Sequence, residues 1–280
     1  PTGAVQNPQE PQAQWAAKSS DKKTEWVGYK VQVAESVSDE ALGPGEPTPN
    51  VITSVVTQPA SHSDEAGMAA TFQEQHRCGL DKPSELYVDG AYISAGALAQ
   101  AQEEKRELLG PAQPSASRGK GFRTEDFAVD IEQRRALCPA GKENTQCSCL
   151  NEAKSGKISY RFEWSTHCHD CPRRESCVGK EQRHRTLVVG EHHNLLQARR
   201  REQKTDAFRQ RMKARPGIEG TQSEMVRAHG MRRARYRGLA KVTLQNHFIG
   251  AACNLKRWLR RIAWQMQQDI QRSVVAPALA

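Results

Sequence analysis

The stretch LYVDGAYIS, residues 86–94, decides the fold that the sequence predicts. Leu86 and Val88 are typical of a short buried strand, which ends at Asp89. An acid at this position, followed by small residues, lies where open α/β sheets bind their ligands. The same position also favours an aspartate that only hydrogen-bonds its own turn. Asp89 is therefore a candidate site residue whose role depends on the rest of the chain.

Strands and helices alternate on both sides of this stretch. Upstream, the period-two pattern of EWVGYKVQVAESV, residues 25–37, predicts a half-buried strand, and the β-branched run at residues 51–57 predicts its hairpin partner. A Ser-rich cap then begins a helix that ends at a glycine. Downstream, residues 95–106 predict a helix that leads to a strand at residues 107–109. This order predicts an α/β fold with a sheet flanked by helices.

The composition is that of a folded protein with long polar connections. A chain of 280 residues with 37% hydrophobic residues can form one large domain or two small ones. Its net charge of +9 favours an anionic partner such as nucleic acid or an anionic membrane face. Neither a membrane-spanning run nor the apolar core of a secretory signal is present in the sequence. We therefore expect a cytoplasmic protein with no membrane partner.

The segment after the last predicted strand has a different character. A Pro-, Ser- and Gly-rich stretch begins at Gly110, and the chain from there to Gly190 holds six of the eight cysteines with few apolar runs. We predict a cysteine-rich insert at residues 110–190. It interrupts a core formed by residues 25–109 and 191–275, and a loose lead-in at residues 1–24 precedes that core.

The cysteines of the insert have the spacing of a metal site. Cys168, Cys171 and Cys177 form a C-x2-C-x5-C run, and Cys138 lies thirty residues before Cys168. Four thiolates suit tetrahedral zinc and leave no open position, so the predicted zinc is structural and anchors an insert with little apolar content. Reduced thiols without metal are the alternative, and disulfides are not expected in the cytoplasm. Competing ligands are Cys147, Cys149, His167 and His169.

The last part of the chain predicts helices with an apolar stripe. We expect this stripe to pack against the core, with the basic residues beside it facing solvent, and direct DNA contact by those residues is the alternative. The stripe consists of Leu244, Phe248, Ala252, Leu255, Leu259, Ile262 and Met266. The neighbouring basic residues are Lys256, Arg257, Arg260 and Arg261.

The segment RPGIEGTQSEMVRAHGMRRARYRG, residues 215–238, carries six arginines and two acids, Glu219 and Glu224. An acid in the first turn of a helix is favoured by the helix dipole alone, which is one explanation of Glu219. Together, Asp89 and Glu219 could instead bind Mg²⁺ while the arginines hold phosphates. Glu224 points to another face of the helix and is the weaker candidate. Gly220 predicts a close approach of the backbone.

Three stretches resemble one family. LYVDGAYIS is similar to the Asp-Ala-Gly-Tyr stretch of bacterial insertion-sequence transposases of the DDE type, with Gly and Ala in the reverse order. RPGIEGTQSEMVRAHGMRRARYRGLAKVTLQNHFIGAACNLKRW resembles the C-terminal signature of that family, and EWVGYKVQVAES resembles its Gly-Tyr-Lys strand. The resemblance extends from Gln12 to Trp258. It also places four cysteines at the positions found in the insert.

The resemblance implies a ribonuclease H-like mixed sheet flanked by helices and three metal-binding acids. Such enzymes use two Mg²⁺ ions to cleave a DNA strand and join its 3′-hydroxyl to a target. Asp89 matches the second acid and Glu219 the third. The implied partner is double-stranded DNA, at element ends and target, and the intact protein is expected to be a homo-oligomer associated with the bacterial nucleoid. The implied phosphate contacts are Arg227, Arg232, Arg233, Arg235, Arg237 and Lys241.

The first acid has no clear counterpart. Asp21 lies in a charged loop, and Asp64 is typical of a helix cap. We therefore expect an N-terminally truncated transposase, with an incomplete two-metal site and no activity on its own. The alternative is a non-catalytic, zinc-containing DNA-binding protein in which Asp89 and Glu219 are structural. A redox protein using Cys168 and Cys171 has little support, because the surrounding pattern is not thioredoxin-like.

Overall fold

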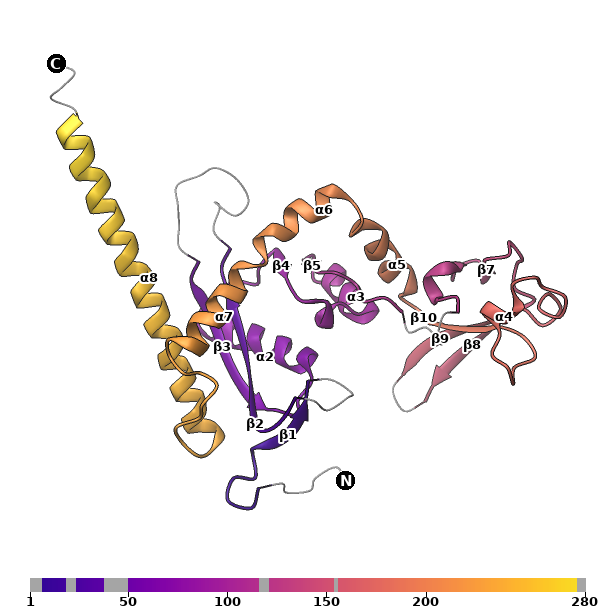
Figure 1. Cartoon of the computed structure of the whole chain (residues 1–280), viewed down its shortest axis with the longest axis horizontal. Helices are drawn as coiled ribbons and strands as arrows, with labels where there is room; N and C mark the ends of the chain where they lie inside the picture. Colours follow the sequence, from indigo (N-terminus) through magenta and orange to yellow (C-terminus); the bar gives the residue numbers. More distant parts are fainter. Residues whose placement is uncertain (1–6, 19–23, 38–49, 116–120, 154–155, 276–280) are drawn as a thin grey trace. The chain divides into compact units, whose positions relative to one another are not determined.

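A computed structural model describes residues 7–18, 24–37, 50–115, 121–153 and 156–275, with side chains up to residue 271. The chain forms two compact units (Figure 1). Unit 1 consists of Pro1–Pro83 and Arg211–Ala280, and unit 2 consists of Ser84–Gln210. The core predicted from the sequence contributes residues to both units, and the cysteine-rich segment belongs to unit 2.

The sheet of unit 1 is an antiparallel meander. Strands β1 (Gln14–Ala17), β2 (Glu25–Glu35) and β3 (Ile52–Pro59) are hydrogen-bonded in that order. The predicted hairpin is confirmed, since β2 and β3 pair from Tyr29↔Pro59 to Ala34↔Ser54. Strand β1 lies inside the segment expected to be a loose lead-in, and that expectation does not hold there because residues 14–17 pair with β2.

Helix α2 (Asp64–Arg77) covers one face of this sheet (Figure 1). The Ser63 side chain caps it by accepting a hydrogen bond from the backbone N–H of Ala66 at 3.1 Å, as the Ser-rich cap predicted. Gly67 faces β2 so closely that an added Cβ would lie 2.6 Å from the Gln32 side chain. The helix therefore packs tightly against β2 at a position that suits glycine.

Helix α8 (Leu239–Val275) packs across β3. Its contact face carries the buried residues Val242, Ile249 and Cys253, and the last two join a core cluster with Ile52 of β3. The Asn254 side chain completes the contact, because it accepts from the Ile52 N–H at 2.8 Å and donates to the Ile52 carbonyl at 2.9 Å. Val242, Ile249 and Cys253 recur at helical spacing and define the packed face.

The expected packing of the apolar stripe on α8 is wrong. Phe248 is 67% exposed, and the side chains of Leu244, Leu255, Leu259 and Met266 are also more than half exposed. At 3.6 residues per turn the stripe lies on roughly the opposite side of α8 from the face that packs on β3. The C-terminal half of the helix extends beyond the strands of unit 1 (Figure 1). A continuous apolar surface is thus left uncovered within the described chain.

Short helices precede α8. Helix α6 (Asp206–Arg211) and the 3₁₀ helix η3 (Met212–Ala214) lead to α7 (Gly217–Arg227). Met225 of α7 is fully buried in the cluster formed by β3 and α8. The chain leaves α7 through Gly230, whose φ of 69° lies in the left-handed region that favours glycine.

One part of unit 2 is a small α/β layer. Strands β4 (Glu85–Tyr87) and β5 (Glu107–Leu109) are parallel and are connected by η1 (Gly90–Tyr92) and α3 (Ala95–Glu103). Helix α5 (His193–Glu202) packs against α3. The buried Arg199 of α5 donates to the carbonyl oxygens of Leu108 at 2.7 Å and Gly110 at 3.2 Å, which ties this helix to the end of β5.

The cysteine-rich segment has its own sheets. It contains η2 (Thr124–Asp126), the hairpin β6 (Ala128–Asp130) and β7 (Arg135–Leu137), the meander β8 (Gln146–Glu152), β9 (Lys157–Glu163) and β10 (Thr186–Gly190), and the single turn α4 (Arg174–Cys177). The expectation that it lacks apolar content is wrong, because nine buried residues, including Phe162 and Trp164, form a core. These residues are spread over short strands and the loops between them, so they give no long apolar run in the sequence.

Candidate functional site

Asp89 lies just beyond the end of β4 in unit 2. It is exposed and caps η1, where its carboxylate accepts a hydrogen bond from the Gly90 N–H at 2.7 Å. The Val88 N–H donates to the Leu109 carbonyl at 2.7 Å and continues the parallel pairing up to this point. Gly90 itself is buried, and an added Cβ would lie 2.8 Å from the Pro111 carbonyl oxygen. A tightly packed turn thus holds an accessible carboxylate at a strand end.

Glu219 lies in the first turn of α7 in unit 1. Its side chain is 62% exposed and forms an ion pair with Arg215 one turn earlier, with Nη1 and Oε1 3.2 Å apart. The predicted close approach at Gly220 is not made within the described chain, since nothing lies within 4 Å of an added Cβ there. Glu219 therefore presents its carboxylate to solvent at the positive end of a helix.

Asp89 and Glu219 belong to different units, so their convergence on a common cation stays a prediction. The first acid of the proposed site is not identified among the described residues. Asp64 forms an ion pair with Lys30 of β2 at 2.9 Å, and Ser63 is the cap of its helix. Asp21 lies outside the described residues.

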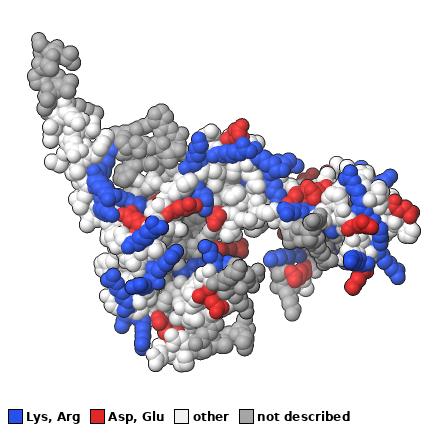
Figure 2. Space-filling model, in the orientation of Figure 1, with Lys and Arg blue, Asp and Glu red and all other residues white. Residues whose placement is uncertain are grey.

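The six residues predicted to contact DNA phosphates are all exposed. They are Arg227 at the end of α7, Arg232, Arg233, Arg235 and Arg237 in the loop that follows, and Lys241 in the first turn of α8. Within the described chain none of them forms an ion pair with an acid. Figure 2 shows lysine and arginine side chains gathered over this end of unit 1. We call this set the basic loop.

The basic loop is held by polar side chains of unit 1. Gln245 of α8 accepts from the Arg235 N–H at 2.8 Å and donates to the Arg233 carbonyl at 3.0 Å. At the start of α8, Glu10 accepts from the Gly238 N–H at 2.8 Å, and Gln12 accepts from the Leu239 N–H at 2.8 Å. The loop backbone is therefore fixed while its guanidinium groups remain in solvent.

A buried polar network, which the sequence did not reveal, joins β2, α7 and α8. Glu35 at the end of β2 forms an ion pair with Arg257, with Oε2 and Nη1 3.2 Å apart. The Thr221 hydroxyl of α7 donates a hydrogen bond to Glu35 and accepts one from Arg257. Glu224, the weaker acid candidate, pairs with Lys256 at 2.8 Å and Arg257 at 3.4 Å. The hydrogen bond from Lys256 lowers the pKa of Glu224. No sequence spacing connects residue 35 with residue 257.

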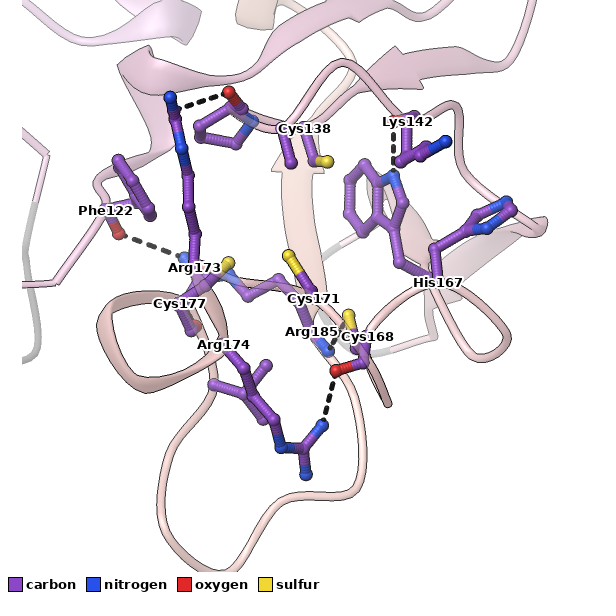
Figure 3. Close-up of a pocket in the computed structure, with 14 residues that line it drawn as sticks. Phe122, Cys138, Lys142, His167, Cys168, Cys171, Arg173, Arg174, Cys177 and Arg185 are labelled. Atoms are coloured by element: carbon purple, nitrogen blue, oxygen red, sulfur yellow. Dashed lines mark hydrogen bonds between the residues drawn. The ribbon is translucent and has the colours of Figure 1, made fainter.

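The four predicted zinc ligands line one cavity of about 20 Å³ in unit 2. Figure 3 shows the sulfur atoms of Cys138, Cys168, Cys171 and Cys177 around the same space. The volume is that of about one water-sized sphere, which suits a single ion. Burial raises the pKa of the Cys177 thiol, and charge on the other three cysteines would raise it further. The four sulfurs line one cavity but do not form a group of three or more ligand atoms within 4.8 Å of one another in the described chain, so zinc binding by these cysteines stays a prediction.

The loops around this cavity are tied down by hydrogen bonds. The Arg185 N–H donates to the Cys168 sulfur at 3.4 Å, and the Cys138 N–H donates to the Lys142 carbonyl at 2.9 Å. Arg174 donates to the carbonyl oxygens of Cys168 and Arg183, both at 2.9 Å. Of the competing ligands, His167 also lines the cavity, whereas Cys147 and Cys149 lie on β8 and His169 pairs with Asp170.

Among the described residues, no helix combines the length and the apolar character needed to cross a membrane. A family model described as a transposase DDE domain matches residues 137–259. The matched range includes Glu219, the basic loop and the four cavity cysteines, and it begins after Asp89. No curated protein and no solved structure matched the chain.

Proposed function

We propose that the protein acts in DNA transposition by metal-dependent cleavage and transfer of DNA strands, because a family model described as a transposase DDE domain matches residues 137–259. The observation that carries this proposal is the family match over Glu219 and the exposed basic loop. The proposed fold of the catalytic part is ribonuclease H-like. The order strand, strand, helix, strand, helix, strand from β2 to β5 supports it, while the joining of the β2–β3 and β4–β5 sheets into one mixed sheet is part of the proposal.

Asp89 and Glu219 are the proposed ligands of Mg²⁺. Both carboxylates are accessible, and carboxylate oxygens are the ligands that Mg²⁺ prefers in proteins. When bound, the metal would polarise the scissile phosphate and activate the attacking oxygen. Arg215 forms an ion pair with Glu219 at 3.2 Å and orients its carboxylate. The turn packed at Gly90 fixes the position of Asp89.

The proposed common site is tested with Fe²⁺ in place of Mg²⁺. Iron bound between two carboxylates, with ascorbate and peroxide, cleaves the backbone close to its ligands. We expect cuts near both residue 89 and residue 219, and loss of both in Glu219→Gln. Asp206→Asn, which removes an exposed acid paired with Arg209, is the control and leaves both cuts. Cuts at only one position, or cuts that persist in Glu219→Gln, would exclude a shared site.

The basic loop is the proposed phosphate-binding surface for double-stranded DNA. Guanidinium groups that lack acidic partners can each replace a counterion on DNA. We expect the logarithm of the DNA affinity to fall with the logarithm of salt, and the slope to decrease by about 0.9 for each arginine removed. Fluorescence anisotropy with Arg232→Ala, Arg233→Ala and Arg235→Ala measures this. Arg77→Ala, an exposed arginine paired with Glu74, should leave the slope unchanged.

A structural zinc ion in the cysteine cavity is part of the proposal. Four thiolates supply a closed tetrahedral site that holds the loops after β7 and β9 together. Metal analysis should give zinc in the purified protein and its loss in Cys171→Ser. The exposed Cys78 lies outside the cavity, so Cys78→Ser should keep the metal. Equal zinc in Cys171→Ser and the unaltered protein would remove Cys171 from the ligand set.

The proposed oligomer is a homodimer that covers the exposed stripe of α8. Phe248, Ala252, Leu255, Leu259, Ile262 and Met266 follow one another at steps of four and three, which is the spacing of a coiled-coil seam. An apolar surface of this extent on a soluble protein marks an interface. Of the basic residues beside the stripe, Lys256 is paired with Glu224 and Arg257 with Glu35 of the same chain, which reduces the repulsion between two copies.

Sedimentation equilibrium measures this association. We expect a dimer that Leu259→Glu dissociates, because a buried charge without a partner is costly at such a seam. Gln267→Glu adds the same charge to the same helix outside the stripe and should keep the dimer. A monomer in the unaltered protein, or a dimer that survives Leu259→Glu, would contradict the seam.

A second candidate is a non-catalytic, zinc-containing DNA-binding protein associated with the nucleoid. The exposed basic loop and the cysteine cavity favour it, since neither requires catalysis. The iron-cleavage experiment separates the two candidates. A DNA-binding protein without a catalytic metal site would show the salt slope but no paired cuts at residues 89 and 219.

A further inference from the structure

A second group of metal-ligating side chains lies in unit 1, away from the cysteine cavity. Glu224 of α7, His229 in the turn after α7 and Cys253 of α8 each offer one ligand atom, and these atoms all lie within 4.8 Å of one another. Ligands on a tetrahedral metal with bonds of about 2.0–2.3 Å are separated by somewhat less than this distance. A small contraction would therefore bring all three onto one ion.

His229 gives an independent indication of a ligand. Its Nε2 atom is buried and has no hydrogen-bond partner within the described chain. A buried nitrogen without a partner costs about 1–3 kcal/mol, so such atoms call for an explanation. A metal ion would satisfy the imidazole. The turn is fixed by hydrogen bonds from the Gly230 N–H to the Val226 carbonyl at 3.2 Å and from the Met231 N–H to the Met225 carbonyl at 3.1 Å.

Cys253 supplies a sulfur in a dry environment. The residue is 0% exposed, and burial, followed by the charge of Glu224, raises the pKa of its thiol. A neutral thiol here has no acid–base use at neutral pH. Metal binding would displace its proton and convert it into a strong ligand. The core around it, including Ile249 and Met225, would exclude water from the ion.

Glu224 is already held in place. Lys256 binds its Oε1 at 2.8 Å, and Arg257 approaches its Oε2 at 3.4 Å. An ionised carboxylate has about four lone-pair positions, so it can keep both partners and still offer one to a metal. The two cations also offset the negative charge that a carboxylate and a thiolate bring into a buried site.

We propose that Glu224, His229 and Cys253 form a binding site for a zinc-like divalent metal ion that fastens α7 and the turn after it to α8. Nitrogen, sulfur and oxygen ligands together select a borderline metal such as Zn²⁺ and not Mg²⁺ or Ca²⁺, which prefer oxygen alone. Three protein ligands leave the fourth position of a tetrahedral ion for one further ligand.

The site differs from both metal sites considered above in its ligands and its place. It uses none of the four cavity cysteines, and it does not include Asp89 or Glu219. Its position gives it a structural consequence, because His229 lies between Arg227 and Arg232 of the basic loop and Cys253 lies on the packed face of α8. A bound ion would fix the beginning of the basic loop to the core of unit 1.

Cobalt titration of the full chain tests the inference. Thiolate–Co²⁺ charge-transfer and d–d absorption bands report coordination by cysteine and its geometry, and a ratio of bound metal to protein reports the number of sites. From the thiolate charge-transfer bands we expect two cysteine-bound equivalents in the unaltered protein, one in Cys253→Ser and one in Cys171→Ser. His229→Gln and Glu224→Gln should weaken the unit 1 site by at least about 10–100-fold, the range found even for indirect metal partners.

Control variants keep the outcomes distinct. Cys78→Ser should retain two equivalents, because Cys78 is exposed in unit 1 and belongs to neither group. His229→Gln changes a half-buried residue, so a normal far-UV circular dichroism spectrum of that variant separates ligand loss from misfolding. Loss of an equivalent in Cys253→Ser and weaker binding in His229→Gln would support the site.

Two results would overturn the inference while leaving the cysteine cavity intact. The first is a single equivalent in the unaltered protein that Cys171→Ser removes and Cys253→Ser does not. The second is cobalt affinity in His229→Gln within twofold of that in the unaltered protein. Conversely, a single equivalent removed by Cys253→Ser but not by Cys171→Ser would support the site and reject zinc in the cavity. The outcome is independent of the proposed role in transposition.

Discussion

At the scale of single residues, Glu35 and Arg257 form a buried ion pair, and removal of either partner is expected to destabilise the fold. The Glu35 side chain is 5% exposed, and Arg257 also donates to the Asn50 carbonyl at 2.8 Å. A buried pair adds little net stability compared with apolar side chains, but removal of one partner leaves a buried charge uncompensated.

Arg257→Leu should therefore lower the free energy of unfolding of unit 1 by about 3–5 kcal/mol. Lys256→Leu is the matched control on the adjacent residue. Its ammonium is more exposed, so that change should cost about 1 kcal/mol or less. Urea unfolding followed by circular dichroism measures both. Equal effects of the two substitutions would contradict the special role of Arg257.

Two glycines of unit 2 provide a second matched pair. A Cβ on Gly110 would lie 2.8 Å from the Val88 carbonyl oxygen and 2.9 Å from side-chain atoms of Val88 and Ile93, whereas a Cβ on Gly96 would meet nothing within 4 Å. We expect Gly110→Ala to destabilise unit 2 by about 1–3 kcal/mol through overpacking. Gly96→Ala, inside α3, should stabilise it by about 0.5–1 kcal/mol. Thermal unfolding of both variants checks the opposite signs.

At the scale of elements, local sequence patterns predicted strands and helices well where the residues that form the pattern are also the residues that pack in the fold. The alternation in residues 25–37 gave β2, the β-branched run gave β3, and Ser63 gave the start of α2. The position of Asp89 at a strand end was also readable. These features depend on neighbours in sequence, which is why they could be predicted.

The packed face of helix α8 could not be predicted from local sequence patterns. The more regular apolar stripe of this helix faces away from β3, while the packed face includes Gln245 and Asn246, which no hydrophobic pattern would select. Asn246 donates to Thr57 at 3.0 Å, and His247 bonds the Val55 carbonyl at 2.9 Å. Which face packs is decided by partners about 190 residues away in sequence, on β3. The network of Glu35 and Arg257 was missed for the same reason.

The contact of Asn254 with β3 gives a prediction for this element. Asn254→Ala leaves the Ile52 N–H and carbonyl without their side-chain partner, which should cost about 1–3 kcal/mol for each group that water does not reach. Gln267→Ala, on an exposed part of the same helix, should have almost no effect. Hydrogen exchange of the Ile52 amide provides the specific measurement. Unchanged protection in Asn254→Ala would contradict the assignment of this bond.

At the scale of the whole molecule, the two units have separate cores and should respond separately to acid. His193 of unit 2 is buried, and burial, followed by the charge of Arg200, lowers its pKa from 6.5 to about 4. The folded state therefore keeps this imidazole neutral at a pH where the unfolded chain protonates it.

The stability that depends on this neutral histidine is present above pH 6.5 and is lost as the pH falls from 6.5 towards about 4, because the unfolded state binds the proton more readily in that range. His193→Gln should make the decline in the midpoint temperature of unit 2 shallower across this window. Calorimetric scans from pH 7 to pH 4 would show it. An identical pH slope in the variant would contradict a buried, neutral His193.

The way the two units divide the polypeptide has a consequence for the order in which a ribosome can complete them. Unit 2 is one continuous segment, so all of its own contacts are available once Gln210 has left the exit tunnel. Unit 1 is discontinuous, and the bonds from Glu10 and Gln12 to the start of α8 join residues 228 and 227 positions apart. Strands β1, β2 and β3 must therefore wait for α8 through most of translation. During that time the apolar surface of β3 is protected by chaperones, or α8 must pack on it rapidly once synthesis ends.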